Sequence, residues 1–259
     1  SVFVVLLDFA FLSTSMAAGA EIGNSFPMSE LIKILIIGSL ILSLYAGIMC
    51  WVGARTALSP FILSRFALGT VGAKWSDILL GGTQILWYAV QTAYLGLLLA
   101  KGLGLEQYYV TITIFCGLFT GAFAIKGTKG MEIIAWVSMP FFVWLAIKIP
   151  AISVDFAGSG EGLMNIKPAN MDSMTFIAAI TSVVGTFCSG ATNSPNWARF
   201  AKTPTQGFLS GFLGFFIDTV VMVLYGMMCG LAIANGDMIE VMMSLGIIAM
   251  AMLILVFNI

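Results

Sequence analysis

Long apolar stretches separated by short polar connections run through almost the whole chain. We count eight, at roughly 1–22, 31–53, 76–100, 107–126, 130–149, 172–197, 206–234 and 239–259. A helix that crosses a membrane needs roughly 20 predominantly apolar residues. The stretches are too long and too continuous for the alternating strands of a membrane barrel. The pattern therefore predicts an all-α membrane protein that crosses the bilayer several times.

The composition supports the same class of protein. Hydrophobic residues make up 60% of the 259 residues and charged residues 9%, and the mean hydropathy is +1.05. The chain has no His, which argues against a haem, a His-ligated zinc ion or His-based catalysis. Its four cysteines lie singly in apolar segments without metal-binding spacing. We therefore expect the lipid bilayer as a partner, and no enzyme, no resident cofactor and no nucleic-acid partner.

The basic residues predict how the chain is oriented in the membrane. Seven of them lie between segments 2 and 3, 4 and 5, and 6 and 7: Arg55, Arg65, Lys74, Lys126, Lys129, Arg199 and Lys202. The other side has four: Lys33, Lys101, Lys148 and Lys167. Because Lys and Arg concentrate in cytoplasmic loops, the first group is predicted to be cytoplasmic, together with the N-terminus, in a multi-pass protein of the cell membrane. The connection 150–171 is predicted to be an exposed outer loop.

Segments 1 and 6 differ from the others because small and hydroxyl residues lie where lipid would favour Leu or Ile. Segment 1 contains Ser13-Thr14-Ser15, and segment 6 runs through Gly185, Gly190 and Pro195. Glycine loosens a helix and proline removes a backbone donor. Either segment alone is explained by close helix packing. Two interrupted helices five segments apart instead predict a five-plus-five inverted-repeat (LeuT-type) transporter fold.

This fold predicts how the chain is divided. Residues 1–149 would form the first five-helix repeat, 150–171 the outer loop and 172–259 the start of the second repeat. The chain begins with Ser1 inside an apolar run and stops at Ile259 inside another. We therefore expect a fragment of a longer transporter, truncated within its eighth helix.

Gly81-Gly82-Thr83-Gln84-Ile85-Leu86-Trp87 is the most informative motif of the chain. Gln84 and Trp87 are three residues apart and share one face of a helix. A buried amide needs a hydrogen-bond partner, and the indole offers a flat face beside it. This pair suits a small, flat, hydrogen-bonding solute such as a nucleobase. The alternative is structural, with Gln84 bonding another helix and Trp87 packing or lying at the membrane interface.

Several stretches, in the same order along the chain, resemble the bacterial cytosine permeases of the nucleobase:cation symporter-1 family. They are Ser13 to Met16, Gly53 to Leu58, Ser64 to Gly69, Leu79 to Gln84 with Trp87, Gly185 to Phe187, Arg199-Phe200 and Asn258-Ile259. The motif of Gln84 and Trp87 is the most specific of them. The resemblance implies the inverted-repeat fold, with this chain covering helices 1 to 7 and part of helix 8.

The resemblance also implies a substrate site between helices 1, 3, 6 and 8. Gln84 would hydrogen-bond the base and Trp87 would stack on it. Phe187 would cover the other face of the base. The site would be lined by Thr186, Ser189 and Gly190, and Asn258 would lie near both base and cation.

For the coupling ion, the resemblance implies backbone carbonyls at the positions of Asp8 and Leu12, with Asn258 nearby. Ser13 can add a hydroxyl or carbonyl oxygen to a hard cation. Asp8 departs from the family, in which this position is usually small. It can add charge to a cation site, couple protons, or serve as a structural acid near the cytoplasmic mouth. Asp218, also within a membrane segment, is expected to have a pairing or structural role.

Together these observations predict a secondary transporter that imports a nucleobase, with cytosine the expected substrate, coupled to Na⁺ or H⁺. A second hypothesis is a transporter of the same fold for allantoin, hydantoin, a thiamine-precursor pyrimidine or an amino acid. A channel or a non-transporting membrane fragment is the third. The interrupted helices at paired positions argue against a purely structural protein.

Overall fold

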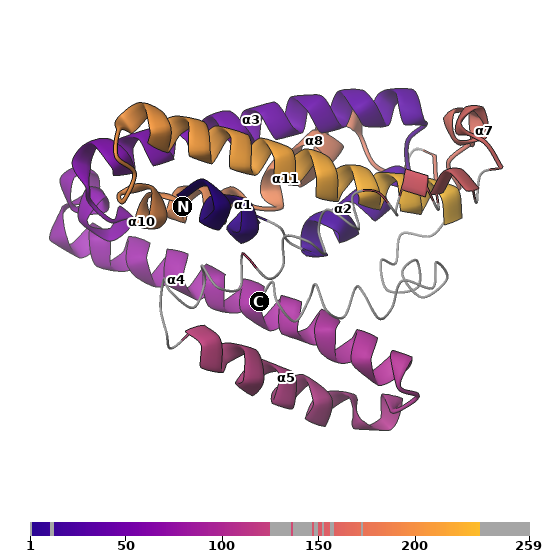
Figure 1. The fold of residues 1–259 in the computed structure, drawn as a ribbon, viewed down its shortest axis with the longest axis horizontal. Helices are drawn as coiled ribbons and strands as arrows, with labels where there is room; N and C mark the ends of the chain where they lie inside the picture. Colours follow the sequence, from indigo (N-terminus) through magenta and orange to yellow (C-terminus); the bar gives the residue numbers. More distant parts are fainter. Residues whose placement is uncertain are drawn as a thin grey trace.

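The computed structural model describes residues 2–10, 13–124, 136, 147, 150–151, 153–155, 158–171 and 173–233. Within these ranges the chain forms helices and no strand (Figure 1). The helices are α1 Val2–Ala10, α2 Ser13–Gly23, α3 Met28–Thr56, α4 Pro60–Gly102, η1 Glu106–Tyr108, α5 Tyr109–Ala124, α7 Gly160–Asn165, α8 Phe176–Gly185, α9 Cys188–Asn193, α10 Pro195–Ala198 and α11 Pro204–Ile233.

The centre of the fold is the pair of long helices α3 and α11, which lie side by side (Figure 1). They run antiparallel, because Gly207 near the start of α11 faces Ala54 near the end of α3, and Gly211 faces Cys50 and Ala46. Glycine at these positions brings the two backbones close together, which is how helices without a hydrophobic driving force associate in lipid. Helices α1 and α2 pack against α11 as well.

Two apolar clusters form the core at different levels of this helix pair. The Phe215 cluster consists of Leu6, Leu42, Ala46, Cys50, Phe187, Ala191, Ala198 and Phe215. The Val223 cluster consists of Ile22, Met28, Leu31, Ile34, Leu35, Ala179, Val183, Val223, Met227, Met228 and Leu231. Both draw on α3, on α11 and on both of the segments that were predicted to be interrupted.

The predicted interruption of segment 6 is confirmed. Helix α8 ends at Gly185, and α9 begins only at Cys188. Phe187 between them has non-helical angles, φ −145° and ψ 29°. A third short helix, α10, starts at Pro195, the position where a ring without an N–H is tolerated. In segment 1 the structure describes α1 up to Ala10 and α2 from Ser13. Residues 11–12 lie outside the described residues, so the predicted interruption of this segment stays a prediction.

The predicted loop between segments 2 and 3 is wrong, because most of it is helical. Helix α4 begins at Pro60, well before the predicted start at residue 76, and continues to Gly102. Its backbone departs from helical angles at Gly69, with φ 68° and ψ −177°, which glycine adopts at little cost. The hydropathy pattern did not predict the first turns of α4, because Arg65 and Lys74 lower the local mean hydropathy without preventing a helix.

Three stretches of the described chain are long and apolar enough to cross a membrane: Met28–Thr56, Phe176–Ala198 and Pro204–Leu231. This supports a multi-pass membrane protein. The outer connection is partly helical instead of a plain loop, since α7 forms there with the Ser159 hydroxyl accepting a hydrogen bond from the Gly162 amide at 2.8 Å. The predicted segments 130–149 and 239–259 fall almost entirely outside the described residues.

Candidate functional site

The structure brings together two residues that the sequence placed in the site, one from α4 and one from α9. The indole Nε1 of Trp87 donates a hydrogen bond to the Ser189 hydroxyl at 3.1 Å. Ser189 lies on α9, directly after the interruption at Phe187. The contact therefore joins the Gly-Gly-Thr-Gln motif to the interrupted helix, and it sets the orientation of the indole plane.

Gln84 lies one helical turn before Trp87, on the same face of α4. Its Nε2 is buried and has no hydrogen-bond partner within the described part of the structure. A buried amide donor without a partner typically costs about 1–3 kcal/mol, so its position next to the indole calls for an explanation. A ligand that supplies an acceptor at this point would remove the cost.

The interruption itself contributes Thr186, Phe187 and Gly190. The Thr186 hydroxyl donates to the Val183 carbonyl at 2.7 Å, which satisfies it within its own helix. The Phe187 side chain is 2% exposed and stacks on Phe215, with ring centroids 5.6 Å apart and an interplanar angle of 19°. A Cβ at Gly190 would overlap the Phe187 ring, so glycine is required there.

Phe187 therefore lies in the Phe215 cluster in this structure. Its predicted role as a cover for the second face of the base stays a prediction, and it requires the ring to turn away from Phe215. Tyr88 and Gln91 lie on the same helix as Gln84. The Tyr88 hydroxyl is within 2.9 Å of the Thr120 hydroxyl of α5, which identifies it as a contact between α4 and α5.

Sequence reasoning missed one polar contact that positions the interrupted helix. The Tyr45 hydroxyl of α3 and the Thr192 hydroxyl of α9 lie 2.7 Å apart. Thr192 also donates to the carbonyl of Cys188, one turn earlier in α9. No local signal marks Tyr45, because only the packing of α3 against α9 brings the two hydroxyls together.

The predicted cation-binding residues are only partly described. Leu12 and Asn258 lie outside the described residues. Asp8 lies within α1 and Ser13 is the first residue of α2. Among the described residues, no group of three or more His, Cys, Asp or Glu side chains could hold a metal ion.

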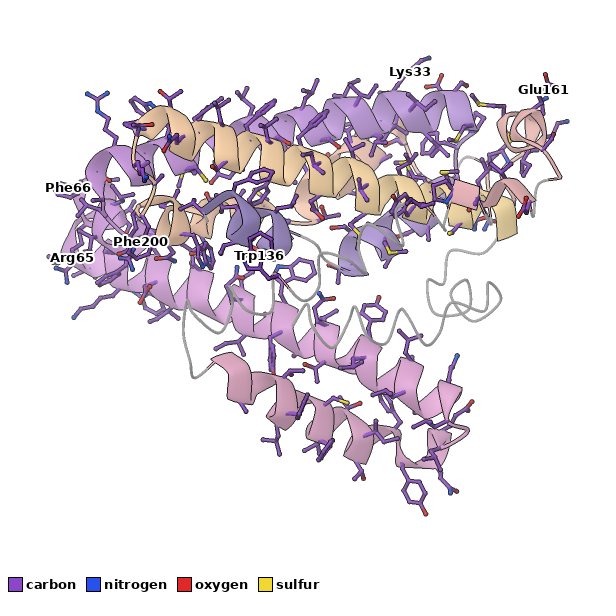
Figure 2. All side chains as sticks on the ribbon, viewed as in Figure 1. Lys33, Arg65, Phe66, Trp136, Glu161 and Phe200 are labelled. Atoms are coloured by element: carbon purple, nitrogen blue, oxygen red, sulfur yellow. The ribbon has the colours of Figure 1, made fainter. Side chains whose placement is uncertain are left out.

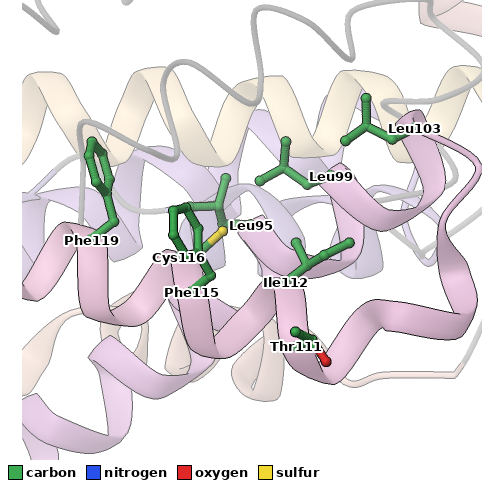
Figure 3. Close-up of a pocket in the computed structure, with 8 residues that line it drawn as sticks. All are labelled: Leu95, Leu99, Leu103, Thr111, Ile112, Phe115, Cys116 and Phe119. Atoms are coloured by element: carbon green, nitrogen blue, oxygen red, sulfur yellow. The ribbon is translucent and has the colours of Figure 1, made fainter.

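An apolar pocket of about 550 Å³ lies between α4 and α5, but its lining does not match the predicted site (Figure 3). It is lined by Leu95, Leu99, Leu103, Thr111, Ile112, Phe115, Cys116 and Phe119. None of these residues belongs to the Gln84 motif or to α9. A nucleobase needs several directed polar partners, and this lining offers almost none.

The arrangement of helices is shared with solved transporters. The structure resembles Mhp1, described as a nucleobase-cation-symport-1 family transporter in a closed conformation with bromovinylhydantoin bound, with a TM-score of 0.80 and 15% sequence identity. The match covers 99% of this chain and 61% of that one. The inward-facing conformation of Mhp1 matches with a TM-score of 0.74 and 14% identity. The chain thus has the LeuT-type transporter fold.

The family follows from the sequence itself. A family profile described as "Permease for cytosine/purines, uracil, thiamine, allantoin" matches residues 3–258, and the chain belongs to this family. The cytosine permease of Escherichia coli strain K12 is 28% identical over 263 residues, and that of Escherichia coli O157:H7 is 27% identical. Each match covers 98% of this chain and 60% of the relative, so the chain spans about three fifths of the relatives' length. The predicted family and fold are confirmed.

Proposed function

We propose that the full-length protein is a secondary transporter that imports a nucleobase, with cytosine as the substrate, together with Na⁺ or H⁺. The proposal rests on two neighbouring side chains. The buried amide nitrogen of Gln84 has no hydrogen-bond partner among the described residues, and the indole of Trp87 is held by its hydrogen bond to Ser189. Membership of a permease family gives the proposal its class of activity.

The two side chains suit the two kinds of surface that a base presents. The Gln84 amide has donors on its nitrogen and an acceptor oxygen, which match the alternating donors and acceptors at the edge of a pyrimidine. The indole of Trp87 offers a face for stacking, which is worth about 1–3 kcal/mol per base. Because Ser189 holds Nε1, the indole is oriented before the base arrives, and less entropy is lost on binding.

Transport would proceed by alternating access. The site lies where α4 meets the interrupted α8–α9 segment, and rocking of one helix bundle against the other exposes it to one side of the membrane at a time. Nothing covalent happens to the substrate in this mechanism, so the protein is not an enzyme. The coupling ion would bind near Asp8, Leu12, Ser13 and Asn258, where carbonyl and hydroxyl oxygens suit a hard cation.

The test is uptake of labelled cytosine by the full-length protein in proteoliposomes. Gln84→Ala is expected to raise the concentration needed for half-maximal uptake roughly 5- to 150-fold, the equivalent of about 1–3 kcal/mol for one buried hydrogen bond. Replacing Na⁺ and collapsing the pH gradient in separate arms identifies the coupling ion.

The matched control is Gln107→Ala, the same change at an exposed glutamine of η1 outside the proposed site. It should leave uptake unchanged. Unlabelled uracil, allantoin, hydantoin and thiamine are added as competitors to test the other heterocycles. Uptake that is equal in Gln84→Ala and wild type would refute the recognition role of Gln84.

A further inference from the structure

Asp218 is a carboxylic acid in the middle of α11 that the proposed substrate site does not use. Its side chain is 1% exposed, and its Oδ1 has no hydrogen-bond partner within the described part of the structure. An ionised carboxylate at the centre of a membrane helix is costly, and such residues commonly belong to ion or proton pathways.

Asp218 lies on the face of α11 that packs against α1 and α2. Gly214, Asp218, Met222 and Gly226 follow one another at four-residue spacing and form one stripe along the helix. A Cβ at Gly214 would lie 3.3 Å from the backbone nitrogen of Leu7 on α1, and one at Gly226 would overlap the carbonyl oxygen of Met16 on α2. Asp218, one turn after Gly214, therefore lies between the level of Leu7 on α1 and that of Met16 on α2.

Helix α3 places a second polar residue at the same level. Gly211 of α11 faces Ala46 of α3. Asp218 lies seven residues after Gly211, and Ser39 lies seven residues before Ala46. Because the two helices are antiparallel, these equal steps bring Asp218 and Ser39 to the same level. The Ser39 hydroxyl is fully buried and has no partner among the described residues, and the same holds for the hydroxyl of Thr14 in the first turn of α2. We call Thr14, Ser39 and Asp218 the polar layer.

The polar layer separates the two apolar clusters of the core. Along α3, Ser39 lies between Leu42 of the Phe215 cluster and Leu35 of the Val223 cluster. Along α11, Asp218 lies between the two residues for which the clusters are named. Three helices thus each contribute an unsatisfied buried oxygen between well-packed apolar regions. A proton on Asp218 would turn one of these oxygens into a donor and leave the hydroxyl oxygens as acceptors.

Asp218 is also close to the proposed substrate site through a short series of contacts. It lies one turn after Phe215 on the same helix face. Phe215 stacks on Phe187 at the start of α9, and Ser189 two residues later holds Trp87. A movement of α11 against α1 and α2 would therefore be transmitted through these contacts to the indole of Trp87.

No described charged side chain from the neighbouring helices compensates Asp218. The titratable groups on α1, α2, α3 and α7 are Asp8, Glu21, Glu30, Lys33, Tyr45, Cys50, Arg55 and Glu161. Glu30 and Lys33 pair with each other at 2.8 Å, and Arg55 lies over the Trp51 ring. Glu21 and Glu161 are exposed, Tyr45 meets Thr192, and Cys50 faces Gly211. The Asp8 side chain lies outside the described residues.

We propose that Asp218 is a proton-binding site of the transporter, placed on the face of α11 against which α1 and α2 pack. Asp218 carries a proton while this packing is closed. When α1 and α2 move away from α11 and water enters, the carboxyl O–H bond breaks, the proton passes to water and a carboxylate remains. The inference rests on the proposed transport function, and it assigns H⁺ as a coupled ion.

The first experiment is independent of transport. Infrared spectra of the purified full-length protein in lipid at neutral pH are recorded for wild type and Asp218→Asn. The difference spectrum should contain the carbonyl band of a protonated carboxylic acid, and Asp218→Glu should show the band at a shifted frequency. If the difference spectrum contains only carboxylate bands, Asp218 is ionised and the proposal fails.

The second experiment separates a coupling site from a structural acid that happens to be protonated. Asp218→Asn keeps the shape of the side chain but cannot release a proton. This variant should retain exchange of labelled for unlabelled cytosine. The accumulation of cytosine that a pH gradient drives should fall at least tenfold. The matched control is Thr219→Val at the adjacent buried position, which should keep both activities.

Gradient-driven accumulation equal to wild type in Asp218→Asn overturns the proposal, and so does a change in Na⁺ dependence alone. A wild-type protein that takes up no cytosine would refute the proposed function instead, and the infrared measurement would still decide whether Asp218 binds a proton.

Discussion

One hydrogen bond distinguishes Trp87 from an ordinary apolar residue of a membrane helix, and it supports the proposed role of Trp87 in the substrate site. Most aromatic residues of a membrane helix pack against neighbours or lie at the interface. Trp87 instead donates to Ser189, a residue 102 positions further along the chain. The bond restrains the indole one helical turn from the Gln84 amide nitrogen, which has no partner among the described residues.

Two substitutions separate the contributions of stacking and of this hydrogen bond. Trp87→Phe keeps a stacking face and loses the bond, so the dissociation constant for cytosine should rise by about 2- to 13-fold, the equivalent of about 0.5–1.5 kcal/mol. Trp87→Ala also loses the stacking, and a further loss of about 1–3 kcal/mol is expected. Binding is measured by calorimetry on the full-length protein in detergent.

Ser189→Ala is the control for this pair, because it removes the same bond from the other partner. A double-mutant cycle between Trp87→Phe and Ser189→Ala should give a coupling energy close to that of one neutral hydrogen bond. Strictly additive effects of the two changes would show that the bond does not contribute to binding.

At the level of elements, the closeness of α2 and α11 depends on glycine on both helices. A Cβ at Gly226 would overlap the carbonyl oxygen of Met16, and one at Gly23 would overlap the carbonyl oxygen of Met227. Both obstacles are backbone atoms, so no side chain can turn aside to make room. Asp218 lies on the same face of α11 as Gly226, the face that packs against α1 and α2.

Gly226→Ala is therefore expected to destabilise the full-length protein by about 1–3 kcal/mol, the usual cost of overpacking. The measurement is thermal unfolding in detergent, where the midpoint should fall. The control is Gly81→Ala, where no described atom lies within 4 Å of the added Cβ. That change should be neutral or slightly stabilising, since alanine is the better helix former. Equal midpoints for the two variants would contradict the close packing of α2 on α11.

At the scale of the whole molecule, Arg65 and Lys33, which the sequence assigned to opposite sides of the membrane, lie at opposite ends of the structure (Figure 2). Arg65 lies at one end, near Phe66 and Phe200, and Lys33 and Glu161 lie at the other (Figure 2). The long axis of α3 and α11 connects these ends (Figure 1). If the plane of the membrane is perpendicular to this axis, the excess of basic residues places the end that carries Arg65 in the cytoplasm.

Cysteine labelling tests this orientation. In a Cys188→Ala background, which removes the exposed cysteine among the four described ones, Arg65→Cys should react with a membrane-impermeant maleimide only after the cells are opened. Lys33→Cys should react in intact cells. Labelling of both variants from the same side, or in the reversed pattern, would refute the predicted topology.

The sequence by itself determined the class of protein, its family and the interruption of segment 6. These properties depend on local composition: apolar runs long enough to cross a bilayer, glycine and proline within segment 6, and the Gln84–Trp87 spacing. The sequence also placed Gln84, Trp87 and Ser189 in one site, through the family resemblance. It failed at residues 60–75, where charged side chains lowered the hydropathy of a stretch that is nevertheless helical.

Only the tertiary structure decided which of these residues meet. It joined Trp87 to Ser189, placed Phe187 in the core against Phe215, and set the polar layer of Thr14, Ser39 and Asp218 between two apolar clusters. The physical reason is that an unpaired buried oxygen or nitrogen is a property of packing between helices distant in sequence. Hydropathy reflects the free energy of placing a side chain in lipid. The neighbouring helices decide whether a buried polar atom has a hydrogen-bond partner in the protein or is available to a ligand or a proton.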